Sequence, residues 1–208
     1  MWLIVHMERD LHIDEFKKDF EENSLEYVSS KWIFERVPYL FGDDYSSFIN
    51  TKLFISKSLG VDSCSIFFVG SSSVGFSLNP FKNLKPFDEY SDIDIAIISH
   101  YYFDVAWRTI QDIDFTKAST QIQTAIKEHR DRLIYWEIIA LDKILGVMPF
   151  AKIWMGMLES LKEQPFFSNR KISYRLYRNH EALRRYQINN FQKALPQLLG
   201  VEPLSITL

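Results

Sequence analysis

Hydrophobic residues in the N-terminal third of the chain recur with helical spacing. Residues 13–34 carry such a pattern and predict one or two amphipathic helices. The side chains expected to face inward there include Phe16, Phe20 and Tyr27. A further helix is predicted over 43–59, with Asp43 or Asp44 as its N-cap and Gly60 just past its end. The chain is therefore expected to begin with a helical region.

Three later stretches have the pattern of strands. Residues 65–69 form a short apolar run that ends at a glycine, which predicts a buried strand. Residues 92–99 alternate at first and are then wholly apolar, which predicts a second strand. In residues 170–178 the apolar side chains share one face, as expected of a half-buried strand. The residues on that apolar face are Ile172, Tyr174 and Leu176.

The segments between and after these strands predict helices. One is expected to begin at Asp104 as N-cap, one or two more span 116–145, and another covers 150–164. A closing helix is predicted after Asn179, whose side chain is a suitable N-cap. The tail from Pro196 is expected to be irregular. Together with the strands, these helices predict an α/β (α+β) fold.

The composition of the chain bounds the possible classes of protein. With 208 residues, of which 47% are apolar, one domain over 1–208 is expected. It is divided into N-terminal helices (11–60), a core motif region (63–99) and a helical C-terminal part with one strand (104–196). The net charge of −3 gives no general attraction to nucleic acid or to anionic membranes, so phosphate binding requires a local patch.

The single cysteine and the absence of a long apolar run predict where the protein works. Cys64 excludes an internal disulfide framework and a site built on several cysteines. The first five residues are too short for the apolar core of a signal peptide, and no run reaches membrane-spanning length. We therefore expect a cytoplasmic protein without a membrane partner.

A glycine and three serines follow directly on the first predicted strand. Glycine at a strand end permits backbone conformations and close approaches that a side chain would block. Neighbouring backbone N–H groups and serine hydroxyls donate hydrogen bonds to phosphate oxygens. Gly70, Ser71 and Ser72 are therefore predicted to bind the phosphates of a nucleotide.

Two aspartates stand at i and i+2 in the second predicted strand. Asp92 and Asp94 are expected on the same side of that strand, so their carboxylates should converge. Two such charges repel each other unless a cation joins them, and hard oxygen ligands of this kind suit Mg²⁺. The alternative is a solvated strand entrance beside an ordinary loop. The occurrence of both motifs together favours a magnesium (or manganese) site for phosphoryl or nucleotidyl transfer.

These two motifs resemble the signature of the DNA polymerase β-like nucleotidyltransferase superfamily. That signature has a GS pair after one strand and an acid, an apolar residue and a second acid on the next, here at 70–71 and 92–94. The resemblance covers residues 65 to about 99. It implies a small mixed sheet flanked by helices, a GS motif that holds a triphosphate, and catalytic carboxylates Asp92 and Asp94 that hold the metal.

The chain departs from this family pattern in two ways. The loop between Ser71 and Asp92 is longer than in minimal members, and either a lid, an acceptor grip or an ordered surface insertion would explain it. Active relatives also place a third carboxylate on a neighbouring strand, whereas the strand at 170–178 offers Ser173 or Arg175. Three acids are candidates for that carboxylate, each with an alternative: a solvated or capping role for Asp112 and Asp114, and pairing with a basic residue for Glu137.

Basic residues gather around the last predicted strand. Charge runs are usually solvated, and Arg184 and Arg185 are expected to be so. Arg175 and Arg178 lie in or at the end of a presumed core strand, where an unpaired guanidinium is costly. A triphosphate or the protein's own acids would each be suitable partners, and Arg175 is predicted to bind the nucleotide.

The leading hypothesis is a magnesium-dependent nucleotidyltransferase. It would transfer a nucleoside monophosphate from a nucleoside triphosphate to an unidentified hydroxyl on a protein, an RNA, another nucleotide or a small molecule. The breadth of the superfamily leaves room for a toxin or antiphage module and for a partner protein. The alternative hypothesis is a nucleotide-binding regulatory domain that has lost turnover, and a purely structural interaction protein is a third.

Overall fold

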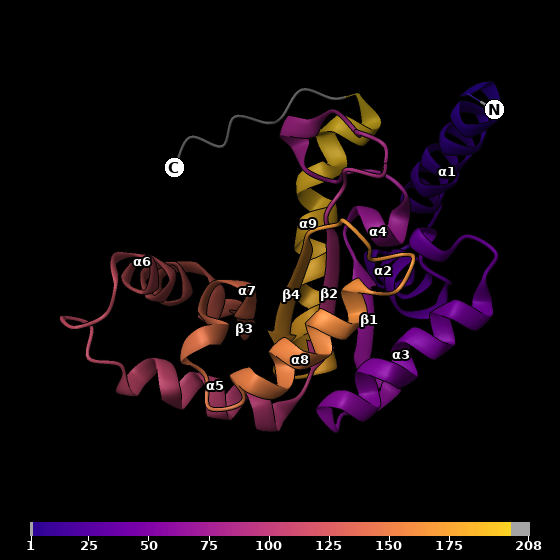
Figure 1. Cartoon of the computed structure of the whole chain (residues 1–208). Helices are drawn as coiled ribbons and strands as arrows, with labels where there is room; N and C mark the ends of the chain where they lie inside the picture. The colour runs from indigo at the N-terminus through magenta and orange to yellow at the C-terminus, as the bar shows by residue number, and fades with distance from the viewer. Residues whose placement is uncertain (1, 201–208) are drawn as a thin grey trace, which may run out of the picture.

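The computed structural model describes residues 2–200, with side-chain detail from residue 12 onward. A sheet of four strands lies at its centre, in the order β1-β2-β4-β3 (Figure 1). The strands are β1 (Ile66–Val69), β2 (Ile93–Ile98), β3 (Ile138–Ala140) and β4 (Ile172–Tyr177). β1 and β3 run antiparallel to their neighbours, whereas β2 and β4 are parallel. The prediction of a mixed sheet flanked by helices is confirmed.

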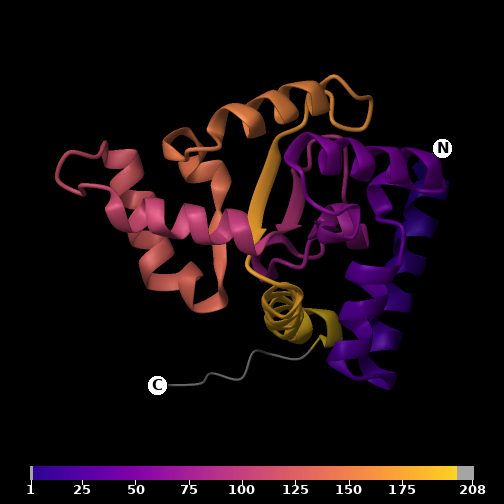
Figure 2. The same ribbon diagram turned by 90° about the horizontal axis from the view of Figure 1, so that it is seen from below.

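Helices cover both faces of this sheet (Figure 2). The helices are α1 (Trp2–Glu22), α2 (Leu25–Ser29), α3 (Tyr45–Leu59), α4 (Ser71–Val74), α5 (His100–Asp112), α6 (Thr120–Glu128), α7 (Leu141–Ile144), α8 (Ala151–Lys162) and α9 (His180–Leu199). Helices α3, α5 and α8 pack on one face, around Phe68, Ile95 and Leu176. Helices α1, α2 and α9 and the helical turn at Ser30–Glu35 pack on the other, around Val69, Ala96 and Tyr177. None of the helices in the described part of the chain is long and apolar enough to cross a membrane.

The alternation of side chains along β2 and β4 sends polar residues to the α9 face. Ile93, Ile95 and Ile97 fill the core beneath α3 and α8, so Asp94 faces the opposite side. Asp94 pairs with Ser173 in the sheet register, and Ala96 pairs with Arg175. The alternation of side chains in the two strands therefore brings Asp94, Ser173 and Arg175 to the same face of the sheet.

Several helix ends were predicted correctly because their caps are local. The Asp44 side chain accepts a hydrogen bond from the N–H of Ser47 at the start of α3, and Gly60 ends that helix in the left-handed conformation. The Asn179 side chain caps α9 in the same way, accepting from the N–H of Ala182. β1 begins one residue later than predicted, at Ile66.

Other boundaries were wrong for identifiable reasons. α5 begins at His100 because the Ser99 side chain caps it, and Asp104 lies inside the helix beside His100. α9 continues through Pro196 to Leu199, because Gly200, in the left-handed conformation, is the residue that ends it. β3 was missed because a strand of three residues has no readable alternation.

The N-terminal helical region also differs from its prediction. α1 already begins at Trp2, and the chain then breaks before Ser24 caps α2. Phe16 is fully buried, as predicted, but 48% of Tyr27 is exposed. The break between the two helices changes the phase of the helical pattern, which turns Tyr27 outward.

His129 joins β3 to the helix before it, and its replacement should weaken the fold. The ring is fully buried, and its Nδ1 atom lies 2.6 Å from the carbonyl oxygen of Ala125. Its Nε2 atom accepts a hydrogen bond from the N–H of Ala140 at 2.9 Å. The ring is therefore neutral, and its burial lowers the pKa of His129. We expect His129→Ala to cost about 2 to 4 kcal/mol in urea unfolding at pH 8.

The lowered pKa of His129 also predicts how the free energy of unfolding depends on pH. Because the pKa of His129 is lower in the folded protein, its contribution is complete above the unfolded value of 6.5 and is lost as the pH falls below it. The difference in unfolding free energy between wild type and His129→Ala should therefore shrink from pH 8 to pH 5. His100→Ala, at an exposed position, is the matched control, and an equal pH dependence in both variants would contradict this account.

Candidate functional site

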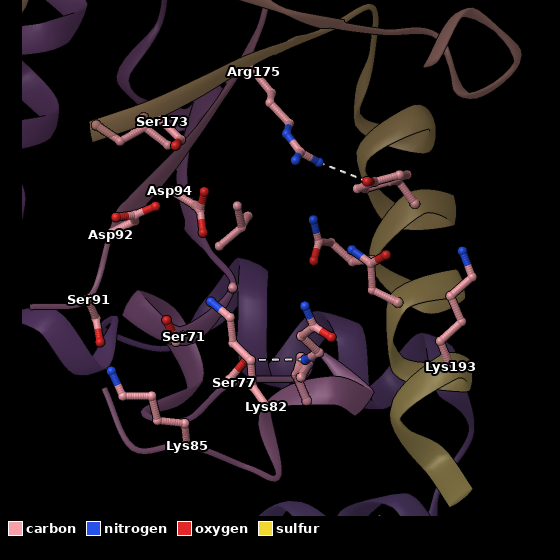
Figure 3. Close-up of a pocket in the computed structure, with 18 of the residues that line it drawn as sticks. Ser71, Ser77, Lys82, Lys85, Ser91, Asp92, Asp94, Ser173, Arg175 and Lys193 are labelled. Atoms are coloured by element: carbon pink, nitrogen blue, oxygen red, sulfur yellow. Dashed lines mark hydrogen bonds between the residues drawn. The ribbon is translucent and has the colours of Figure 1, made fainter. Parts of the chain in front are cut away.

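A pocket of about 530 Å³ opens where β1 ends and where β2 and β4 begin (Figure 3). It lies on the face of the sheet that carries α9. The loop between α4 and β2 and one side of α9 form its other walls. The charged residues that line it are Lys82, Lys85, Asp92, Asp94, Arg175 and Lys193. Two acids thus share one pocket with four cations.

Gly70 and Asp94 meet at the floor of this pocket. Gly70 has φ of +64° and ψ of −148°, a conformation that is essentially restricted to glycine. A Cβ atom added at this position would lie 2.8 Å from Oδ2 of Asp94. Val69 and Asp94 are partners in the sheet register, which explains the close approach. The two motifs of the sequence are therefore parts of one site.

The two aspartates have different surroundings. Asp94 lies within β2, where burial raises its pKa to about 6 and repulsion from Asp92 adds to that effect. Asp92 precedes the strand, and its side chain is 47% exposed. Oδ2 of Asp92 accepts a hydrogen bond from Nζ of Lys171 at 3.0 Å. The ammonium group of Lys171 therefore already balances part of the charge of Asp92. Further positive charge near Asp94 would stabilise its ionised form, which burial disfavours.

The serines after Gly70 divide between the pocket and the core. Ser71 lines the pocket beside Gly70. Ser72 is fully buried, and its hydroxyl donates to the carbonyl oxygen of Val69 at 2.8 Å. Ser73 is also buried and donates to the carbonyl oxygen of Trp32 at 2.7 Å. The predicted phosphate-binding hydroxyl of Ser72 therefore points away from the pocket, because it holds the turn that follows β1.

Arg175 lies in the pocket, as the sequence hypothesis requires. Its Nη1 donates to the hydroxyl of Tyr186 on α9 at 2.8 Å, the contact drawn as a dashed line in Figure 3. Burial works to lower the pKa of Arg175, yet the neighbouring tyrosines and Asp94 raise it above the ordinary value. The guanidinium is thus held in place as a charged group on the Asp94 side of the pocket.

The long loop between α4 and β2 is an ordered wall of the pocket. Phe76 anchors it in the core, and an isolated bridge joins Phe76 to Pro86. The backbone N–H of Ser77 donates to the carbonyl oxygen of Lys85 at 2.8 Å. Lys85 also pairs with Asp88 at 3.0 Å. The loop is therefore ordered by its own contacts, and it carries two of the lysines that line the pocket.

One wall of the pocket was not anticipated from the sequence. Gln187, Asn190 and Lys193 project from α9 into it. They lie at intervals of three residues, which places polar groups on one side of a helix whose other side packs in the core. The available signal was this polar spacing within a helix whose remaining inward residues are apolar.

Two of the acids considered as a third carboxylate, Glu137 and Asp114, have other partners. Glu137 pairs with Arg178 at 3.1 Å and with Arg185 at 3.0 Å, the alternative that the sequence left open. Asp114 accepts from Thr116 and pairs with Lys117, which is a capping role. On β4, Ser173 stands directly beside Asp94. The position on the neighbouring strand is therefore occupied by a serine.

Other arginines on or near β4 donate hydrogen bonds to groups of the protein itself. Arg170 donates to the carbonyl oxygens of Asp88 and Ser91, which fixes the loop before β2. Arg184 donates to the hydroxyls of Ser29 and Ser30 and is not merely solvated as predicted. Of the predicted cluster, Arg175 is the member that lines the pocket.

Comparison with known proteins gave no relatives. No protein-family model matches the chain, and neither the curated proteins nor the solved structures gave a significant match.

Proposed function

We propose that the protein is a magnesium-dependent nucleotidyltransferase. The observation that carries this proposal is the close approach of the two motifs, because a Cβ atom added at Gly70 would lie only 2.8 Å from Oδ2 of Asp94. This contact supports the resemblance stated above, because the predicted phosphate turn and the predicted metal ligand share one pocket. The pocket volume of about 530 Å³ is within the usual range for small-molecule sites.

The residues present fit a divalent cation. Asp92 and Asp94 supply hard carboxylate oxygens, and burial keeps the pKa of Asp94 raised although Arg175 acts to lower it, so a further cation would be favourable there. When bound, the metal would neutralise charge on the phosphates and on the attacking oxygen. Mg²⁺ is the expected ion, and Mn²⁺ has the same ligand preference.

The cations of the pocket suit a triphosphate. Arg175 would bind phosphate oxygens from the sheet, while Lys82 and Lys193 would bind from the loop and from α9. Ser71 and the backbone at Gly70 would hold the phosphates at the end of β1. The acceptor hydroxyl oxygen forms a bond to the α-phosphorus, and the bond to the α,β-bridging oxygen breaks. Pyrophosphate leaves with that electron pair, and the hydroxyl proton passes to solvent.

The regulatory alternative has one observation in its favour. Ser173 lies beside Asp94 at the position where active relatives carry a carboxylate. A protein with only these two acids would hold a metal and a triphosphate without promoting attack on the triphosphate. This alternative predicts nucleotide binding without pyrophosphate release.

An assay with labelled nucleotides distinguishes the two. The purified protein is incubated with Mg²⁺ or Mn²⁺ and each α-phosphate-labelled nucleoside triphosphate, with and without cell extract. Transfer of label together with release of pyrophosphate supports the proposal. Binding of the nucleotide with no transfer under any of these conditions supports the regulatory domain.

Replacing Lys171 should make metal binding easier. Its ammonium group lies against Asp92 at 3.0 Å, so a metal must compete with it for that carboxylate. Exposed ion pairs contribute up to about 1 kcal/mol, so Lys171→Ala should lower the half-saturating Mg²⁺ concentration by up to about fivefold. Lys117→Ala, which removes a similar pair with Asp114, should leave it unchanged. A higher Mg²⁺ requirement in Lys171→Ala would contradict this prediction.

A further inference from the structure

Two amide side chains on the α9 wall of the pocket have no part in the function proposed above. Gln187 and Asn190 line the pocket about one helical turn apart. Only 3% of the surface of Gln187 is exposed, so its amide is largely removed from bulk water. No hydrogen bond to either amide is present among the residues that the structure describes. A buried amide without a partner is costly, so these groups call for a partner from outside the chain.

The chemistry of an amide narrows the choice of that partner. Its NH₂ group donates hydrogen bonds, and its carbonyl oxygen accepts them. Ionised phosphate oxygens only accept, so a triphosphate would leave both amide oxygens unpaired, and the cations of the pocket already suit it. A ribose hydroxyl both donates and accepts. The two neighbouring hydroxyls of a ribose therefore offer what two neighbouring amides require.

The position of the amides on α9 favours the sugar over the base. Gln187 follows Tyr186, whose hydroxyl accepts a hydrogen bond from Arg175, and Asn190 lies about one turn before Lys193. Figure 3 shows Arg175 and Lys193 at two levels along this helix. Because both cations are proposed to bind the triphosphate, the amides lie beside its binding site. In a nucleotide the ribose is joined directly to the phosphates, whereas the base lies beyond the ribose. The ribose is therefore the group within reach of both amides.

We propose that Gln187 and Asn190 bind the ribose hydroxyls of the nucleotide and select ribonucleotides over deoxyribonucleotides. The inference rests on the proposed function and deepens it, because it names the sugar of the nucleoside triphosphate. A deoxynucleotide would fit the same space but would leave a buried amide unpaired. That lost hydrogen bond, and not a steric clash, is the source of the selection.

The selection is measured as binding to the purified protein, without an acceptor. The ribonucleoside triphosphates and their 2′-deoxy and 3′-deoxy counterparts are titrated by calorimetry in buffer that contains Mg²⁺. We expect the wild type to bind each ribonucleotide roughly tenfold more tightly than a deoxy counterpart, the effect of losing one hydrogen bond to a buried group. Gln187→Leu has a side chain of similar size without the amide, and in it the preference should fall to about twofold or less.

Three controls locate the effect. Inorganic tripolyphosphate carries the phosphates of the nucleotide without its sugar or base, and wild type and Gln187→Leu should bind it equally. Gln192→Leu makes the same substitution at an exposed position of α9 outside the pocket, and it should keep the preference for ribose. Gln187→Leu should resist urea at least as well as the wild type, because it removes a buried amide that has no partner in the described part of the chain.

The outcomes separate this inference from the proposed function. Equal affinity of the wild type for ribonucleotides and both kinds of deoxynucleotide overturns the ribose site and leaves nucleotidyl transfer intact. Weaker binding of tripolyphosphate to Gln187→Leu overturns it too, because the amide would then bind phosphate. A preference among the bases that disappears in Gln187→Leu, without any preference for ribose, assigns the amides to the base instead. Failure of every nucleotide to bind overturns the inference and the proposed function together. A preference for ribose that depends on Gln187 supports the site even where the transfer assay fails.

Discussion

We expect Asp94→Asn to lower nucleotidyl transfer by roughly a hundredfold to a thousandfold or more. The substitution keeps the shape of the side chain but removes a charge from the floor of the pocket, where it would hold the metal. We expect a larger effect at Asp94 than at Asp92, because Asp94 lies within β2 and is the more buried of the two. Release of pyrophosphate and transfer of label are the measurements. Full activity in both Asp94→Asn and Asp92→Asn would overturn the assignment of the site.

The same substitution should stabilise the metal-free protein, which separates loss of activity from loss of fold. The folded pKa of Asp94 is about 6 and the unfolded value is 3.8, so ionised Asp94 disfavours the folded state. The cost is absent below pH 3.8, grows up to about pH 6 and is constant above it. A difference of this size corresponds to at most about 3 kcal/mol.

Urea unfolding at two pH values tests this expected gain in stability. In chelator-treated buffer, Asp94→Asn should unfold at a higher urea concentration than the wild type at pH 8, and the gain should be smaller at pH 5. Asp114→Asn is the matched control, since Asp112 and Asp114 repeat the i, i+2 spacing on the surface of the protein. A destabilised Asp94→Asn at pH 8 would mean that the carboxylate is compensated within the protein.

The sequence predicts those parts of the candidate site that depend on neighbouring residues and on the alternation of side chains along a strand. Gly70 ends β1 and Asp94 lies in β2, and each was recognised from a few surrounding residues. Ser173 and Arg175 could be placed on the site's side of β4 because alternate residues of a strand face alike. Their register against Asp94 came from the structure.

The parts that were missed depend on packing between distant segments. Gln187, Asn190 and Lys193 line the pocket only because α9 packs across the face of the sheet that carries Asp94. No local pattern links that helix to residues about a hundred positions earlier. Ser72 was assigned to the nucleotide because a run of serines does not reveal which hydroxyl turns inward to the carbonyl of Val69.

The contact between Gly70 and Asp94 leads to the second large effect, in Gly70→Ala. The backbone at Gly70 lies in a region that other residues adopt at a cost of about 1 to 3 kcal/mol. The new methyl group would also meet Oδ2 of Asp94 at 2.8 Å, so the carboxylate must move. Because small displacements of a positioning group cost about a hundredfold in rate, transfer should fall by about that factor.

A second glycine provides a control for a positive φ without a close neighbour. Gly60 has φ of +65°, and an added Cβ atom would meet nothing within 4 Å. Gly60→Ala should therefore destabilise the protein by about 1 to 2 kcal/mol and leave transfer unchanged. Loss of activity in both variants would mean that strain alone, and not the contact with Asp94, explains the effect.

The contact with Asp94 can also be isolated by a double-mutant cycle measured by urea unfolding. In an Asp94→Ala background, the Oδ2 atom that the new methyl group would meet is gone. Gly70→Ala should then cost less than it does in the wild type, and the remaining cost is the backbone strain at position 70 itself. An unchanged cost would place the defect in the backbone of the turn. A reduced cost means that only glycine at position 70 leaves room for the Asp94 carboxylate.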